Sequence, residues 1–204
     1  MTQIGGVVLC GGQSSRMGRP KAWLPFGDEL MLPRGVRLLA EVVKPIVVVA
    51  SPDQNLPFLP PEIEIVHDAQ RGRGPLQGLV SGLEALRGRA DAAYVSSCDV
   101  PFLQAAFVRR SIELLGDFVI CVPEVGGYRH PLAAVYRIEV ADVAARLLAS
   151  DRLRSSLLFE EAATRFVRAK ELADVDPTFQ TLRNLNAMSD YEAAVRELFP
   201  AEGR

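Results

Sequence analysis

The chain has 204 residues, 49% of them hydrophobic, and a formal net charge of −2, which suits one globular domain with a sizeable core. The weak charge argues against nucleic acid or a membrane surface as a partner, and no apolar run reaches the ~18 residues of a membrane helix. We expect no signal peptide. The cysteines, Cys10, Cys98 and Cys121, form no C-x-x-C motif, so we expect neither a zinc site nor disulfides, and a reducing cytoplasm as the location.

Apolar strand-like runs alternate along the chain with stretches of helical periodicity. The expected strands are residues 4–9, 46–50, 63–66, 92–97, 118–122, 132–136 and 164–169. The expected helices are residues 30–43, 75–86, 103–115, 140–148 and 153–163, and a final helix that opens with a Ser189–Glu192 capping box and ends near residue 199. Residues 52–61 are proline-rich and predict a loop, and Gly126-Gly127 predicts a turn between two strands. This alternation predicts an α/β fold, a single three-layer domain over 1–204 with a mostly parallel sheet.

A glycine-rich loop with the sequence LCGGQSSRMGRPK follows the first strand, over residues 9–21. Gly11 and Gly12 let backbone N–H groups approach an anion closely, and Arg16 and Lys21 add positive charge. Because ligands bind at the carboxyl ends of strands in open α/β sheets, the loop predicts a nucleoside triphosphate site. A tight strand-to-helix turn with two solvated cations is the structural alternative.

Two common phosphate-binding motifs do not match this loop. A P-loop needs glycines five residues apart followed by Lys and Ser or Thr, but Met17 stands five residues after Gly12, and Arg19 follows Gly18. The dinucleotide fingerprint G-x-G-x-x-G fails because Gly11 and Gly12 are adjacent. A dehydrogenase of Rossmann type is therefore disfavoured.

Two carboxylates follow other predicted strands at the same edge of the sheet. Asp99 follows the strand at 92–97 and is the candidate ligand for Mg²⁺, which takes one or two carboxylates together with phosphates and water. Its alternative role is to cap the next helix. Asp68 follows the strand at 63–66 and is a candidate hydrogen-bond acceptor for a base or ribose, or else a turn residue.

The loop pattern L-x-G-G-x-S-x-R-M-G-x-x-K resembles the opening motif of nucleotidyltransferases that join a nucleoside monophosphate to a phosphorylated acceptor. Residues 74–79, GPLQGL, resemble the G-P-L-x-G motif of one branch, the molybdenum cofactor guanylyltransferase family. Sugar-phosphate enzymes usually lack this form, so the motif discriminates between them. Cys98 to Phe102, C-D-x-P-F, also resembles the metal-binding strand end of the family. Gly74 and Gly78 are candidates for contact with the acceptor near the start of a helix.

Two later segments resemble the acceptor side of this family. Arg129 and His130 open an R-H-P-L segment, and Asn184 and Asn186 form an N-x-N pair before the final helix. Two residues one apart in an extended segment face the same way. His130 could instead be a structural hydrogen-bonding residue and the asparagines a helix-entry turn, and Asn186 could complete the Mg²⁺ shell with Asp99.

The resemblance, over residues 6–195, implies a Rossmann-like nucleotidyltransferase fold of the glycosyltransferase-A type. The nucleotide-binding half would be about 1–102 and the acceptor-binding half about 103–204. The implied reaction is transfer of GMP from Mg·GTP to molybdopterin, metal-bound or metal-free, with release of pyrophosphate. The implied site residues are Arg16, Lys21 and Asp99 for catalysis, Asp99 for the metal, and Leu9, Cys10, Gly11, Gly12 and Asp68, with Lys21 and Asp99, for the nucleotide. Transient contact with other cofactor-biosynthesis proteins or acceptor apoenzymes is also implied.

Several departures from the family pattern leave the base open. Cys10 stands where the family often has Ala, and Ala50 where an asparagine often contacts nucleotide. Gln77 replaces the alanine of G-P-L-A-G, and Ala187 replaces a threonine. The segment 18–21 is closer to cytidylyl-transferring relatives. The alternatives are therefore CMP transfer to molybdopterin, transfer to a sugar or alditol phosphate, and a non-catalytic GTP-binding or cofactor-carrier protein.

Overall fold

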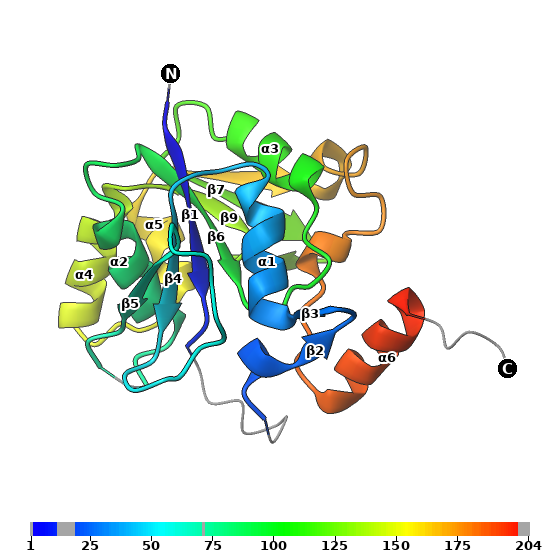
Figure 1. The fold of residues 1–204 in the computed structure, drawn as a ribbon. Coiled ribbons are helices and arrows are strands. Elements are labelled where there is room, and N and C mark those ends of the chain that lie inside the picture. The colour runs from blue at the N-terminus through cyan, green and yellow to red at the C-terminus, as the bar shows by residue number, and fades with distance from the viewer. Residues whose placement is uncertain (1, 12–18, 71, 200–204) are drawn as a thin grey trace, which may run out of the picture.

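The computed structural model describes residues 2–11, 19–70 and 72–199 (Figure 1). Their strands form an eight-stranded sheet with the order β10-β7-β9-β6-β1-β4-β5, and β8 pairs with β7 outside this row. The strands are β1 (Ile4–Leu9), β4 (Ile46–Ala50), β5 (Glu64–His67), β6 (Ala92–Ser97), β7 (Ile120–Val125), β8 (Tyr128–Arg129), β9 (Ala134–Arg137) and β10 (Thr164–Arg168). Each predicted strand is present, with ends shifted by a few residues at most.

The sheet is mostly parallel, as predicted. β1 lies between β4 and β6 and is parallel to both, while β9 is antiparallel to its neighbours β6 and β7. The predicted turn at Gly126 and Gly127 joins β7 to β8, and both glycines have positive φ, 61° and 81°. Glycine adopts this conformation without the steric cost of a Cβ atom, so the hairpin is tight.

Helices cover both faces of the sheet (Figure 1). They are α1 (Met31–Ala40), α2 (Pro75–Ala85), α3 (Ala105–Glu113), α4 (Val140–Ala149) and α5 (Leu158–Glu161). The last helix, α6 (Met188–Leu198), lies beside the sheet, and its Ala194 belongs to a separate apolar cluster with Phe26 and Met31. Alternate residues of β1 face opposite layers: Val7 packs with α2 and α4, and Val8 packs with α1 and α3. Such two-sided burial explains the continuous apolar runs of the central strands. No helix in the described ranges has the length and apolar character needed to span a membrane.

Two local expectations were wrong, and one short element was not predicted. The chain forms a short hairpin of β2 (Pro25–Phe26) and β3 (Glu29–Leu30) before α1, because two-residue strands carry too little pattern to detect. Residues 153–163 form a 3-10 turn followed by the four-residue α5, not one helix. The final helix begins at Met188, so Ser189 lies inside it, and the Asp190 carboxylate accepts hydrogen bonds from the N–H groups of Ala187, at 2.9 Å, and Asn186.

Candidate functional site

The candidate site is a cavity of about 980 Å³ at the carboxyl ends of β1, β4 and β6. From β1 the sheet continues to β4 on one side and to β6 on the other. Such a switch point is where open α/β sheets bind their ligands. Of the residues proposed from the sequence, those that line the cavity are Leu9, Cys10, Gly11, Lys21, Asp68, Gly74, Gly78, Asp99, Asn184 and Asn186. Gly12 and Arg16 lie outside the described residues.

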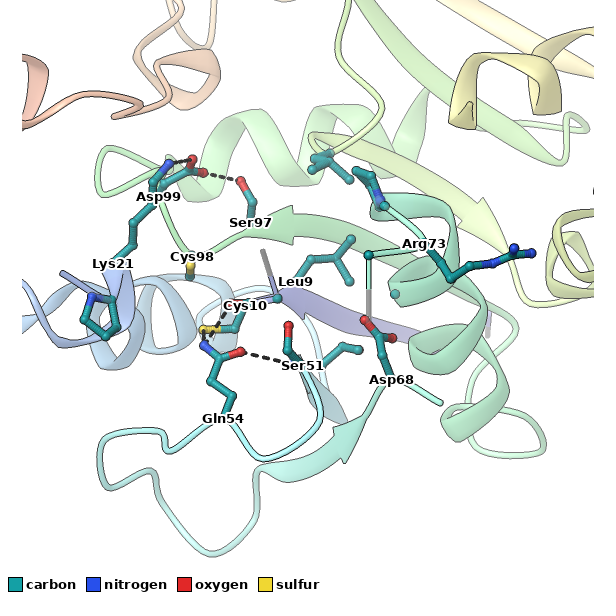
Figure 2. A pocket seen from close by; sticks show the side chains of 18 of the residues that line it. Leu9, Cys10, Lys21, Ser51, Gln54, Asp68, Arg73, Ser97, Cys98 and Asp99 are labelled. Carbon is teal, nitrogen blue, oxygen red and sulfur yellow. Dashed lines mark hydrogen bonds and ion pairs between the residues drawn. The ribbon is translucent and has the colours of Figure 1, made fainter. Parts of the chain in front are cut away.

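Asp99 lies at the centre of a polar cluster just beyond the end of β6 (Figure 2). Its Oδ2 atom is 2.7 Å from the Lys21 Nζ. Its Oδ1 atom accepts hydrogen bonds from the Ser97 hydroxyl at 2.5 Å and from the Asn184 amide at 3.1 Å. The Asp99 side chain is only 11% exposed. A carboxylate this far removed from water requires such compensation by charge and hydrogen bonds.

The asparagine pair reaches the same cluster from the other end of the chain. Leu185, between the two asparagines, is fully buried and its N–H donates to the Asp99 carbonyl at 3.0 Å. Asn186 Oδ1 accepts a hydrogen bond from Lys21 Nζ at 3.4 Å. The two amides therefore face the same side of the segment, as their spacing suggested, and they lie beside the candidate metal ligand.

Asp68 lines another part of the cavity, after β5. Its N–H donates to the Ala50 carbonyl at 2.9 Å, and its Oδ1 atom accepts a hydrogen bond from the Ser81 hydroxyl of α2 at 2.9 Å. Burial raises the pKa of Asp68, and the hydrogen bond from Ser81 opposes that effect. A Cβ atom at Gly11 would lie 3.1 Å from the Ser51 Oγ and 3.5 Å from Asp68 Oδ2. A glycine at this position therefore keeps the space beside Asp68 open.

Ser51 and Gln54, two lining residues that the sequence reasoning did not select, hold the loop after β4 against β1. The Gln54 amide donates to the Cys10 carbonyl at 3.1 Å, and its Oε1 accepts from the Ser51 N–H at 2.9 Å (Figure 2). Contact with the Cys10 thiol, together with burial, raises the pKa of the Cys98 thiol. The position of the loop, directly after a buried strand that ends at the same edge, is the signal that could have identified these two residues.

The loop before α2 is anchored at the C-terminal end of α4. The Arg73 guanidinium binds the Asp151 carboxylate at 2.7 Å and the Leu148 carbonyl at 2.6 Å. Gly74 follows with φ 73°, ψ −173°, a conformation that disfavours any residue with a Cβ. Gly78 has a second constraint, because its Cβ would lie 3.1 Å from the Leu9 side chain. These glycines thus shape the wall of the cavity through the backbone.

Arg129 and His130 are not among the described residues that line the cavity. The Arg129 guanidinium stacks over the Phe166 ring at 4.2 Å and lies 3.6 Å from the Glu124 carboxylate. Burial lowers the pKa of His130, and its Nε2 atom is buried without a hydrogen-bond partner in the described structure. The nearby Leu132 does reach the cavity wall. An acceptor role for Arg129 and His130 thus stays a prediction.

The side chains available to a metal ion here are the Asp99 carboxylate and the amides of Asn184 and Asn186. Within the described ranges no group of three or more His, Cys, Asp or Glu side chains could hold a metal ion. Mg²⁺ does not need such a group, since it usually keeps several waters and takes its other ligands from one or two carboxylates and substrate phosphates. The oxygen donors of Asp99 and Asn186 therefore fit a Mg²⁺ ion that arrives with a nucleotide.

Sequence comparisons give a consistent picture. The family model described as "MobA-like NTP transferase domain" matches residues 6–172. A Mycobacterium tuberculosis protein named "Probable molybdenum cofactor guanylyltransferase" is 34% identical over 201 residues, which cover 95% of this chain and 94% of that protein. A protein of the same name from Mycobacterium marinum is 33% identical over 200 residues, with the same coverage.

Solved structures share the fold at low sequence identity. Molybdopterin-guanine dinucleotide biosynthesis protein A from Archaeoglobus fulgidus superimposes with a TM-score of 0.79 at 19% identity, covering 95% of this chain and 98% of that one. The 4-diphosphocytidyl-2C-methyl-D-erythritol synthase of Anaerococcus prevotii has a TM-score of 0.72 at 13% identity, with coverage of 97% and 96%. The expected nucleotidyltransferase fold is confirmed.

Proposed function

Because this chain belongs to the MobA-like NTP transferase family, and is thus a nucleotidyltransferase, we propose that it transfers GMP from Mg·GTP to molybdopterin. Pyrophosphate is the second product. The names of the relatives that are 33–34% identical over 95% of the chain support a role in molybdenum cofactor biosynthesis. The structural observation that carries the proposal is the Asp99 cluster, which joins a carboxylate, an ammonium group and two amides in the cavity that also contains Asp68.

The chemistry needs positioning and charge neutralisation more than proton transfer. The terminal phosphate of molybdopterin is already anionic when it attacks the α-phosphorus of GTP in line, so no strong general base is required. Bound at Asp99, Mg²⁺ would supply positive charge to the phosphate oxygens. Lys21 adds a second positive charge that stabilises the leaving pyrophosphate, and we assign the same role to Arg16.

Asp68 is the proposed contact for the guanine base or its ribose. An ionised carboxylate only accepts hydrogen bonds, so it suits a partner that presents donors. The amino group of guanine and the ribose hydroxyls are such donors. Ser81 keeps Oδ1 oriented, and the residues from Leu9 to Gly11 line the same cavity, with Gly11 next to Asp68.

Two roles were considered for Asn186, contact with the acceptor and completion of the Mg²⁺ shell, and its position supports the second. Its amide oxygen shares the Lys21 ammonium with Asp99, so we assign Asn186 to the metal and phosphates. Gly74 and Gly78 leave room for substrate through the shape of the wall. Arg129 and His130 keep their proposed role as molybdopterin contacts. They would contact the part of molybdopterin that extends outside the cavity.

The test is turnover with each nucleoside triphosphate. Pyrophosphate release is measured with purified protein, Mg²⁺, molybdopterin and either GTP, CTP, ATP or UTP, with acceptor-free reactions as the control. The proposal expects acceptor-dependent release with GTP and a guanine dinucleotide product. Preferential use of CTP would convert the assignment to CMP transfer, and binding of GTP without pyrophosphate release in any reaction would favour a non-catalytic carrier.

A further inference from the structure

The Lys21 ammonium occupies a position between two hard oxygen donors. Its Nζ atom is 2.7 Å from Asp99 Oδ2 and 3.4 Å from Asn186 Oδ1. Both members of the ion pair are largely removed from water, with side chains 18% and 11% exposed. Figure 2 shows the Lys21 and Asp99 side chains directed toward each other at one end of the cavity. A lysine ammonium therefore stands beside the two oxygens that fit a divalent cation.

The other contacts of Asp99 determine which of its carboxylate oxygens faces the Lys21 ammonium. Oδ1 is engaged by Ser97 and Asn184, which leaves Oδ2 toward Lys21. The Lys21 backbone is held by its neighbours, because Ala22 is buried in the core and the Trp23 indole donates to the Asn55 carbonyl at 3.0 Å. Any exchange of partners by Lys21 must therefore come from its flexible four-carbon stem.

We propose that Lys21 is the resident counter-ion of Asp99 in the nucleotide-free protein and that it exchanges this carboxylate for phosphate oxygens when metal and nucleotide bind together. The inference rests on the proposed function of Asp99 as metal ligand. Two cations so close to one carboxylate oxygen repel each other, and a buried carboxylate without a cation is costly. Lys21 consequently competes with a free metal ion, and a triphosphate removes the competition because it gives the ammonium another anionic partner.

The consequence is positive coupling between metal and nucleotide. Free divalent metal binds weakly, since its binding must separate Lys21 from Asp99. By linkage, the nucleotide raises metal affinity by the same factor as the metal raises nucleotide affinity, and couplings of this kind are typically about 5–150-fold. Removing the Lys21 charge should strengthen binding of free metal and weaken the coupling.

The experiment titrates Mn²⁺ as the probe for Mg²⁺ and follows unbound Mn²⁺ by electron paramagnetic resonance, with and without GTP, in the absence of acceptor. A protein-free titration measures the Mn²⁺ that GTP alone binds. The wild type, Lys21→Met and Arg19→Met are compared. Arg19 lines the same cavity, so its variant removes an equal charge, and no contact between Arg19 and Asp99 is present in the described structure. Lys21→Met should bind free Mn²⁺ about tenfold or more tightly than the wild type and show a correspondingly smaller GTP coupling. Arg19→Met should keep both values near wild type.

Lys21→Arg, which retains the charge, should retain weak binding of free Mn²⁺, and circular dichroism of each variant verifies folding. If Lys21→Met changes neither free-metal affinity nor coupling while the wild type binds Mn²⁺ with GTP, the exchange by Lys21 is wrong and the proposed function stands. Equal tightening in Lys21→Met and Arg19→Met would also overturn it, as a general charge effect. If the wild type binds no Mn²⁺ even with GTP, the metal assignment of Asp99 fails first.

Discussion

The Ser81 hydroxyl donates a 2.9 Å hydrogen bond to Asp68 and so ties α2 to the segment that follows β5. This bond opposes the effect of burial, which raises the pKa of Asp68. Since its pKa is raised in the folded state, Asp68 contributes stability that is fully present below its unfolded pKa of about 3.9. That contribution is lost as the pH rises through the folded pKa.

Asp68→Asn should therefore increase the free energy of unfolding at pH 7 relative to wild type, and the gain should shrink toward pH 4. The same variant should bind GTP more weakly, by about tenfold or more, if Asp68 accepts hydrogen bonds from the nucleoside. Urea unfolding at both pH values and GTP titration measure the two effects. Ser81→Ala is the matched variant and should enlarge the loss of stability with rising pH. Equal destabilisation of Asp68→Asn at all pH values would contradict this account.

Asp99→Asn should reduce turnover about a hundredfold or more, because it removes the negative charge while it retains the shape of the side chain. Folding should survive, since the substitution leaves Leu185 bonded to the backbone of residue 99. Pyrophosphate release over a range of Mg²⁺ concentrations checks the activity, and circular dichroism checks the fold. Near-normal turnover at limiting Mg²⁺ would remove Asp99 from the metal site.

Asn186 and the Arg129–His130 pair should separate in binding experiments. Asn186→Ala should weaken Mg·GTP binding with little change in the affinity for molybdopterin, because Asn186 lies at the Lys21 and Asp99 end of the cavity. Arg129→Ala and His130→Ala should weaken molybdopterin binding and leave GTP affinity unchanged. Removal of one direct hydrogen bond to a ligand should lower the affinity roughly five- to tenfold. The opposite pattern would exchange the two assignments, and normal molybdopterin binding by both Arg129→Ala and His130→Ala would remove that pair from the site.

Gly82→Ala should destabilise the fold by about 1–3 kcal/mol, because overpacking of a sheet-facing position forces its neighbours to move. A Cβ atom at Gly82 would lie 2.4 Å from Cγ1 of Val7, a stiff side chain in the core. Gly35→Ala in α1 is the matched control: nothing lies within 4 Å of its Cβ position, so helix propensity alone should stabilise that variant by about 0.5–1 kcal/mol. Chemical unfolding of both variants tests the difference, and a stabilised Gly82→Ala would show that α2 has room to shift.

The central strands and most helices could be predicted because their signals are local. β1 and β4 are continuous apolar runs and β6 is apolar as far as Val95, and such runs indicate burial on both faces. The positions of Asp68 and Asp99 after strands β5 and β6 likewise follow from chain order, since parallel strands end at one edge. No comparable signal predicted the hairpin of β2 and β3 or the division of residues 153–163 into a 3-10 turn and α5. The conformation of such short elements depends mainly on the residues that they pack against.

Periodicity and the place of a residue after a strand were enough to predict the class of the fold, the edge of the sheet that carries the candidate site and the chemical groups available there. Which of those groups meet depends on the tertiary structure. Lys21 contacts Asp99 across 78 positions and Asn186 across 165, and Ser81 reaches Asp68 from a helix face. Arg129 stacks on Phe166 instead of lining the cavity. Such contacts are set by the packing of helices on the sheet, and no local sequence pattern shows which residues, far apart in the chain, will meet.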